Sequence, residues 1–227
     1  MLVGGTTGSG KTTFVKSLLR QFASMDPAAV DAVIIDGKRE MDYWGALPKS
    51  HFATQFPEVL SGHQHAPAVL DWVVDTEIPR RRDAMLSLAR KASGAPPTAR
   101  QMFYQSLAAG RPVQPFPALI IVIDEFAEIM AAGRSGAASF ERRVQQVTQV
   151  GRSVLVHLIL ATQRPDASIV RGAIKANLDA RVALRLPTHH DSMTILGGKG
   201  AERLLGRGDL IFQAAGQPAL RLQGYSV

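Results

Sequence analysis

Cysteine is absent from the 227 residues of this sequence, so the chain can form neither a disulfide bond nor a zinc site built from thiolates. Long apolar runs are absent as well. The longest ones, residues 118–123 and 154–161, are far shorter than the roughly 20 residues that a membrane-spanning helix needs. The N-terminus also lacks the basic region, apolar stretch and small-residue cleavage site of a secretory signal. We therefore expect a domain without a membrane segment and a cytoplasmic location.

Acidic residues are fewer than basic ones, with 19 Asp and Glu against 26 Lys and Arg, which gives a net charge of +7. This excess favours a polyanionic partner, but a generally basic soluble surface explains it equally well. Apolar residues make up 46% of the chain and charged residues 20%, which is the balance of a folded protein rather than a disordered one. Length and composition together predict one sizeable α/β domain.

Strand-like and helix-like patterns alternate along the chain. Apolar runs predict buried strands at residues 32–35, 118–124, 154–162 and 181–186. Helical spacing predicts helices at residues 12–23, 66–88, 100–108, 140–150 and 168–177. Pro79 is expected to bend or interrupt the second of these helices. The alternation predicts an α/β fold with a mostly parallel sheet and helices on both faces.

A complete G-x-x-x-x-G-K-[ST] motif lies at residues 5–12, between a short apolar segment and an amphipathic helix. We expect the strand before it to begin upstream of Met1, so that the domain is truncated at its N-terminal strand. Glycines allow the backbone N–H groups to face phosphates, and the helix adds its positive end. The predicted nucleotide-binding residues are Gly5, Thr6, Thr7, Gly8, Ser9, Gly10, Lys11, Thr12 and Thr13.

The chemistry expected of this motif is nucleotide binding with hydrolysis. Lys11 is predicted to reach the β- and γ-phosphates, and the Thr12 hydroxyl to ligate Mg²⁺. Asp124 and Glu125 follow the apolar run 119–123, in the arrangement called Walker B. We expect Asp124 to hold Mg²⁺ directly or through water, and Glu125 to polarise the water that attacks the γ-phosphate.

Gln163 follows another predicted buried strand, and the carboxyl ends of parallel strands meet at one edge of the sheet. Gln163 could therefore bond to the γ-phosphate or the attacking water and report it to Arg164. The alternative is a strand end whose polar residues merely meet solvent.

Five segments together resemble the FtsK/SpoIIIE family of ring-forming DNA translocases, within the wider HerA/FtsK group. The segments are residues 5–12, 122–128, 157–165, 174–177 and 204–210. The resemblance implies a RecA-like P-loop NTPase fold and a single ATPase motor domain over residues 1–227. It also implies a homo-hexameric ring that threads double-stranded DNA, with each ATP site completed by the neighbouring subunit. We expect no winged-helix module for reading DNA in this chain, and attachment to a membrane through regions outside it.

The resemblance also suggests roles for several arginines. Arg80 or Arg81 is the candidate finger that enters the neighbouring ATP site, although a solvated basic cluster is an equal alternative. Arg134, in the glycine-rich segment 131–137, and Arg142 after it are candidates for contacts with DNA phosphates. An exposed loop without such a role is the alternative.

Three positions depart from the family pattern. Gly37 replaces the proline of an Asp-Pro-Lys element, Met193 stands where the family carries an arginine, and Gly197 stands where an acid is usual. Two other functions stay open beside DNA translocation. One is a secretion-type ATPase that moves proteins, and the other is an assembly scaffold that nucleotide binding switches.

Overall fold

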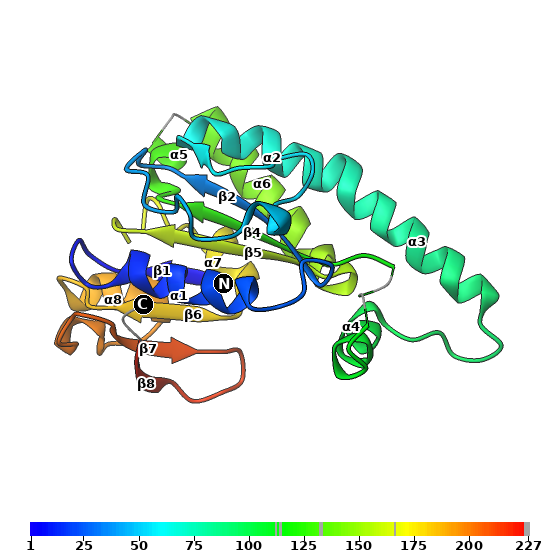
Figure 1. Ribbon diagram of the computed structural model, residues 1–227. Helices are drawn as coiled ribbons and strands as arrows, with labels where there is room; N and C mark the ends of the chain where they lie inside the picture. The colour runs from blue at the N-terminus through cyan, green and yellow to red at the C-terminus, as the bar shows by residue number, and fades with distance from the viewer. Residues whose placement is uncertain (112, 114, 132–133, 166, 225–227) are drawn as a thin grey trace.

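The centre of the computed structural model, which describes all residues except 112, 114, 132, 133, 166 and 225–227, is an eight-stranded sheet. Its strands are β1 (Leu2–Gly4), β2 (Val30–Asp36), β3 (Leu60–Ser61), β4 (Ala118–Asp124), β5 (Val156–Thr162), β6 (Arg181–Leu184), β7 (Asp209–Gln213) and β8 (Leu220–Gln223). In space they follow the order β3-β2-β4-β5-β1-β6-β7-β8 (Figure 1). The first six are parallel, whereas β7 and β8 are antiparallel to their neighbours. The predicted α/β class with a mostly parallel sheet is confirmed.

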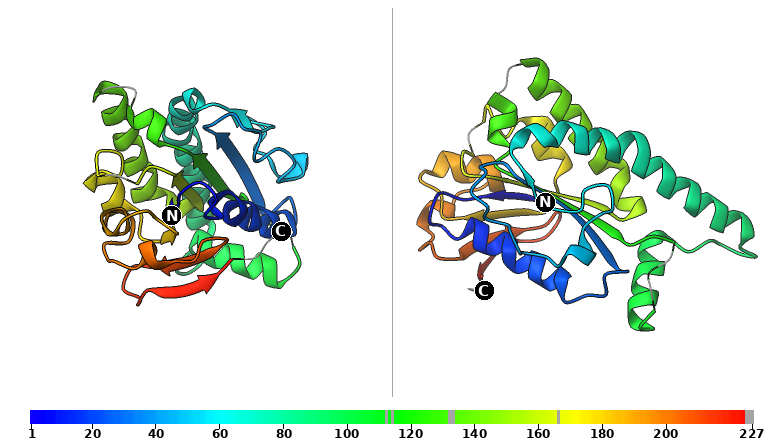
Figure 2. Two further views of the ribbon diagram at one scale, coloured as in Figure 1. Left: turned by 90° about the vertical axis from the view of Figure 1, so that its left-hand side faces the viewer. Right: turned by 45° about the horizontal axis from the view of Figure 1, so that its top comes forward.

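Helices cover both faces of the sheet. They are α1 (Lys11–Ala23), α2 (Ala66–Trp72), α3 (Ile78–Lys91), α4 (Ala99–Ala108), α5 (Ala127–Ala131), α6 (Arg134–Val150), α7 (Gly172–Asn177) and α8 (His189–Leu196). Short 3₁₀ turns lie at Lys49–His51, His63–His65, Gly151–Val154 and Ala201–Arg203, and a π-helical turn at Val73–Glu77. In Figure 2, α1 lies on one side of the sheet and α5, α6 and α7 on the other.

Two hydrophobic cores follow from this layering, because successive side chains of a strand point to opposite faces. Strand β4 shows the division: Ile121 and Ile123 belong to the core under α2 and α6, whereas Ile120 and Val122 belong to the core under α1. All seven residues of β4 are buried. This explains why the strand is a continuous apolar run rather than an alternating one.

Pro79 does not interrupt the helical segment around it, and an interruption was one of the two outcomes predicted. The π-helical turn Val73–Glu77 joins α2 directly to α3, and Pro79 occupies one of the first two positions of α3. The wider π turn, in which the Ile78 N–H donates to the Val73 carbonyl five residues back, lets the helix continue past a residue that has no N–H to donate. The result is a long helix that extends beyond the sheet and leads to α4 (Figure 1).

Other boundaries also differ from the sequence predictions. Helix α6 begins at Arg134 rather than Phe140, so residues 134–137 of the segment 131–137, which was expected to be a flexible loop, are helical. The short helix α4 is present, and a capping box between Thr98 and Gln101 fixes its start. No helix in the described part of the chain is both long enough and apolar enough to cross a membrane.

Candidate nucleotide-binding site

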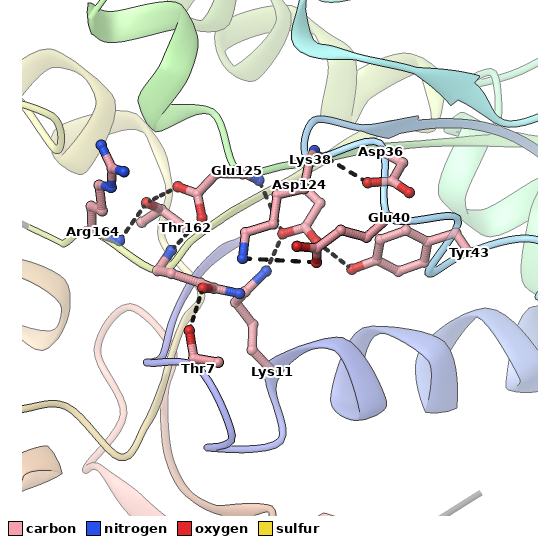
Figure 3. A network of polar contacts seen from close by, with 11 residues as sticks. Thr7, Lys11, Asp36, Lys38, Glu40, Tyr43, Asp124, Glu125, Thr162 and Arg164 are labelled. Atoms are coloured by element: carbon pink, nitrogen blue, oxygen red, sulfur yellow. Dashed lines mark hydrogen bonds and ion pairs between the residues drawn. The ribbon is translucent and has the colours of Figure 1, made fainter.

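The register of the parallel strands collects the predicted site residues at one edge of the sheet. Asp36 at the end of β2 is the register partner of Asp124 at the end of β4. On the other side of β4, the end of β5 at Thr162 pairs with Gly4, the last residue of β1. Segments distant in sequence thus converge around the phosphate loop (Figure 3).

The loop between β1 and α1 has the backbone geometry of an anion cradle. Gly10 has a φ of 99°, and helix α1 begins directly after it at Lys11. A side chain at position 10 would also collide with the backbone, because its Cβ would lie 2.7 Å from the Gly208 nitrogen. The Gly208 N–H in turn donates to the carbonyl oxygen of Ser9 at 3.0 Å. The backbone at Gly208 therefore packs against the phosphate loop and stabilises its conformation.

Lys11 and Asp124 form a buried ion pair at the centre of the site. The Lys11 amine contacts Asp124 Oδ1, and both side chains are only 2% exposed. The backbone N–H of Glu125 also donates to Asp124 Oδ1, at 3.0 Å. The predicted phosphate-binding lysine and metal-binding aspartate are thus brought together, each acting as the other's partner.

Tyr43 is a residue of this site that the sequence analysis missed. Its hydroxyl donates to Asp124 Oδ2 at 2.9 Å, and its ring is fully buried. Burial, followed by the nearby charge of Asp124, raises the pKa of the Tyr43 phenol above its ordinary value, so the hydroxyl remains a donor. No sequence signal distinguishes Tyr43 from a core aromatic, because its role depends on a contact across 81 positions.

The loop that carries Tyr43 is organised by Asp36. The backbone N–H groups of Lys38 and Asp42 donate to its two carboxylate oxygens, each at 3.2 Å. Lys38 extends from this loop toward the phosphate loop and lies 4.0 Å from Glu40 (Figure 3). Gly37, where the family carries proline, donates its N–H to the carbonyl oxygen of Asp124 at 3.1 Å.

Glu125 lies on the other side of Asp124, in a left-handed backbone conformation with φ of 55°. Its carboxylate accepts the Thr162 hydroxyl at 2.8 Å and the backbone N–H of Gln163 at 2.9 Å. The side-chain oxygen of Gln163 accepts the hydroxyl of Thr7 at 2.8 Å. A chain of contacts therefore connects the phosphate loop through Gln163 to Glu125 (Figure 3).

A cavity of about 730 Å³ opens between these groups. It is lined by Thr6, Thr7, Gly37, Lys38, Arg39, Glu40, His63, Glu125, Glu128, Gln163 and Arg164. Two further cavities of about 410 and 480 Å³ also border the phosphate loop, and Arg207 lines both of them. Thr13 lines the second of these. Of the three cavities, the one of 730 Å³ is lined by Glu125 and Gln163.

The residues present fit a magnesium nucleotide. The buried Ser9 hydroxyl has no hydrogen-bond partner among the described residues, as expected of a group that is to meet a phosphate. Asp124 offers a carboxylate and the half-buried Thr12 a hydroxyl at the start of α1, and oxygen ligands suit Mg²⁺. Mg²⁺ is commonly held by one or two such side chains plus the phosphates. The described residues form no cluster of three His, Cys, Asp or Glu that could hold a metal.

Arg81 does not fit the role of a finger that enters a neighbouring site, and that prediction is wrong. Its side chain is 1% exposed and donates to Glu77 Oε1 and the Pro117 carbonyl, both at 2.7 Å, and to the Val154 carbonyl at 3.1 Å. It cannot leave this position without abandoning several buried acceptors. Arg80 is instead 55% exposed and bonds the carboxylate of Glu77.

The two arginines lie far from their own nucleotide edge. The carbonyls that Arg81 bonds belong to residues directly before β4 and within the turn before β5. These are the amino ends of strands whose carboxyl ends carry Asp124 and Thr162. Arg80, next to Arg81 on α3, could therefore serve only the site of another subunit.

The two candidates for DNA contacts lie on α6. Arg134 is the first residue of the helix, and its side chain lies outside the part of the chain that the structure describes. Arg142 is exposed. The adjacent Arg143 is engaged elsewhere, since it bonds Asp71 and Asp75, both at 2.7 Å.

Comparisons with known proteins agree with this geometry. The model of the FtsK/SpoIIIE family matches residues 1–167. A DNA translocase FtsK from Tropheryma whipplei is 36% identical over 98% of this chain, and that match covers 29% of the relative. A DNA translocase FtsK from Mycobacterium tuberculosis is 34% identical over 99% of this chain and is covered to 26%. The chain thus spans less than a third of the length of these relatives.

Two solved structures share the fold. One is the pCW3 conjugation coupling protein TcpA in monomer form with ATPγS, with a TM-score of 0.74, 23% identity and coverage of 100% of this chain and 60% of that one. The other is the cytoplasmic domain of the type VII secretion ATPase EccC from Thermomonospora curvata, with a TM-score of 0.74 and 26% identity. That match covers 99% of this chain and 25% of EccC.

Proposed function

The chain belongs to the FtsK/SpoIIIE family and has its RecA-like P-loop ATPase fold, and on this premise we propose that it hydrolyses ATP to move double-stranded DNA. The observation that carries the proposal is the convergence of Lys11, Asp124 and Glu125 at the carboxyl edge of the sheet, where Lys11 and the Glu125 backbone N–H both contact Asp124 Oδ1. Basic residues in excess over acidic ones are consistent with a DNA partner. ATP as substrate favours a cytoplasmic location for the domain.

Each residue at the edge has a distinct task in hydrolysis. Lys11 would exchange Asp124 for the β- and γ-phosphates. The N–H groups of Gly5, Thr6 and Ser9 donate to protein carbonyls, so other backbone N–H groups of the phosphate loop would bind the phosphate oxygens. Thr12 and Asp124 would hold Mg²⁺, which supplies positive charge beside the phosphates. Glu125 faces the 730 Å³ cavity and polarises the attacking water.

Gln163 couples binding to hydrolysis in this proposal. It touches the phosphate loop through Thr7 and holds Glu125 through its backbone N–H. A γ-phosphate beside Thr7 would compete for the Gln163 side chain. Because Gln163 and Glu125 are directly bonded, such a change at the phosphate loop reaches the group that activates water.

A homo-oligomeric ring, hexameric by resemblance to the family, completes the proposal. Arg80 is exposed at the amino end of the sheet and is the candidate that reaches a neighbouring ATP site. An arginine supplied by a second subunit stabilises charge on the transferring phosphoryl group. Arg134 and Arg142 on α6 are candidates for contacts with DNA phosphates, which carry no sequence information.

The ATPase rate with and without linear double-stranded DNA, measured over a range of salt concentrations, tests the proposal. We expect DNA to stimulate the rate, and the DNA affinity to fall steeply with salt because phosphate contacts release counterions. A rate that neither DNA nor salt changes would contradict DNA translocation.

Protein translocation is a second candidate, favoured by the likeness to the secretion ATPase EccC. It predicts a rate that a protein substrate stimulates and DNA does not. A nucleotide-switched scaffold is a third. Glu125→Gln separates the scaffold from a motor, because the amide has nearly the same shape and keeps one of the two acceptor oxygens but loses the base. A motor should retain ATP binding and lose translocation, whereas a scaffold should keep its function.

A further inference from the structure

We propose that Tyr43 is a positioning residue that holds Asp124 in the orientation in which its carboxylate binds Mg²⁺. The inference rests on the proposed function, because it concerns the metal that accompanies ATP. It assigns a role to the loop after β2, whose residues 37–40 line the same cavity as Glu125.

The contacts of Asp124 divide between its two carboxylate oxygens. Oδ1 is engaged by Lys11 and by the backbone N–H of Glu125, whereas the Tyr43 hydroxyl is bonded to Oδ2. A carboxylate has about four lone-pair sites, so these contacts still leave room for a metal ligand bond. When Lys11 turns to the phosphates, Tyr43 is the side chain that continues to fix the orientation of the carboxylate.

The ring of Tyr43 is itself immobile. It is fully buried in the core beneath α1, in the cluster that includes Val15, Leu19 and Ile34. A hydroxyl in such a core is costly unless it is hydrogen-bonded. Phenylalanine would fill the same space without that requirement. The hydrogen bond that the hydroxyl donates to Asp124 therefore offsets the cost of burying it.

The loop is tied to Asp124 at a second point. The Gly37 N–H donates to the Asp124 carbonyl at 3.1 Å, and a Cβ at position 37 would lie 2.2 Å from that oxygen. Asp36 folds the loop by accepting the N–H groups of Lys38 and Asp42. Asp36 is also the register partner of Asp124 across the sheet. Backbone and side chain of Asp124 are thus both held by one loop, with Tyr43 at its far end.

Groups that hydrogen-bond to a metal ligand orient it, and their loss typically weakens metal binding about 10- to 100-fold. Tyr43→Phe tests the inference because it removes only the hydroxyl. We expect the Mg²⁺ concentration that half-saturates binding of a fluorescent, non-hydrolysable ATP analogue to rise about 10- to 100-fold. Binding of the same analogue in EDTA should be unchanged, since Lys11 and the loop amides remain. Electron paramagnetic resonance of Mn²⁺ in the complex provides a second readout of metal binding.

Tyr104→Phe is the matched control, because Tyr104 is 57% exposed and lies on α4. It should leave the Mg²⁺ dependence unchanged. Asp36→Asn is a second variant, which removes one of the two acceptors that fold the loop and should shift the Mg²⁺ dependence in the same direction. It supplies the test if Tyr43→Phe does not fold.

A folded Tyr43→Phe protein with wild-type Mg²⁺ dependence would overturn the inference. Equal weakening of analogue binding with Mg²⁺ and in EDTA would also overturn it, because that result indicates a structural role alone. Neither result affects the proposed function. Wild-type protein that binds the analogue without any influence of Mg²⁺ would instead contradict the proposed function itself.

Discussion

The amine of Lys11 is paired directly with the carboxylate of Asp124, although the two residues are 113 positions apart in the chain. Both side chains are buried, so neither charge can be compensated by water. The residue proposed to bind phosphate and the residue proposed to bind metal therefore stabilise each other. In the proposed function, a magnesium nucleotide would replace this buried charge pair by two others.

Lys11→Met should destabilise the nucleotide-free protein. Removing one partner of a buried ion pair leaves the other charge uncompensated, which typically costs about 3–5 kcal/mol. Urea denaturation should show that loss in the free energy of unfolding, and ATP should no longer raise the melting temperature. Lys11→Met combined with Asp124→Asn serves as the control, because the neutral amide should recover part of the stability. A Lys11→Met protein as stable as wild type would show that Lys11 does not compensate the buried charge of Asp124.

Arg81→Met should destabilise the fold, whereas Arg80→Ala should not. The Arg81 guanidinium is buried among Glu77 and two carbonyls, so its loss should lower the free energy of unfolding by about 3–5 kcal/mol. Arg80 is 55% exposed, and a partly solvated pair of this kind contributes at most about 1 kcal/mol. Chemical denaturation of the two variants provides the comparison. Equal losses would contradict the different burial of these neighbouring residues.

Arg80→Ala should nevertheless lower the ATPase rate of the assembled protein about 10³-fold or more, if Arg80 completes a neighbouring site. Mixing this variant with Glu125→Gln protein tests whether Arg80 acts in the site of a neighbouring subunit. A subunit that retains Glu125 can then meet a neighbour that retains Arg80, so the mixture should regain activity that neither variant shows alone. A mixture as inactive as its two components would show that Arg80 does not complete a neighbouring site.

Gln163→Ala should lower kcat about 10²-fold and leave the affinity for ATP within a few-fold of wild type. The residue connects Thr7 to Glu125 and lines the cavity in which the attacking water would lie. Loss of a group that acts mainly in the transition state reduces kcat rather than binding. Steady-state kinetics and equilibrium nucleotide binding separate the two effects. Gln217→Ala, in the exposed turn before β8, is the control that should change neither, and a Gln163→Ala protein with wild-type kcat would contradict the coupling.

The β7–β8 hairpin should loosen in acid. Hydrogen bonds from Arg221 at 2.7 and 3.0 Å lower the pKa of the Asp209 carboxyl. A lowered folded-state pKa contributes stability that is present above the unfolded value, about 4, and is lost as the pH falls through the folded value. Hydrogen exchange of the β8 amides should therefore differ between wild type and Asp209→Asn by more at pH 7 than at pH 3. A difference of equal size at both pH values would exclude the carboxylate as its cause.

Much of the sheet could be predicted from the sequence because its parallel strands are buried on both faces. Such strands read as continuous apolar runs, and β4 coincides with the predicted range 118–124. The strands β7 and β8 were not predicted. The pattern of β8 is one reason, since all four of its residues are exposed and it lacks a buried face to leave a signal. The predicted interruption at Pro79 does not occur for a different reason, because the π-helical turn before it accommodates the proline.

The sequence by itself determined the phosphate loop, since its glycines, lysine and threonine lie within eight consecutive positions and their chemistry depends on local backbone geometry. Only the tertiary structure decided that Tyr43 bonds Asp124 and that Arg81 is buried while Arg80 is exposed. Those outcomes depend on strand register and on packing between segments far apart in the chain. A local sequence pattern does not identify such partners, because a tyrosine or arginine can occupy the same position in the pattern whether its side chain contacts solvent, a core or a metal ligand.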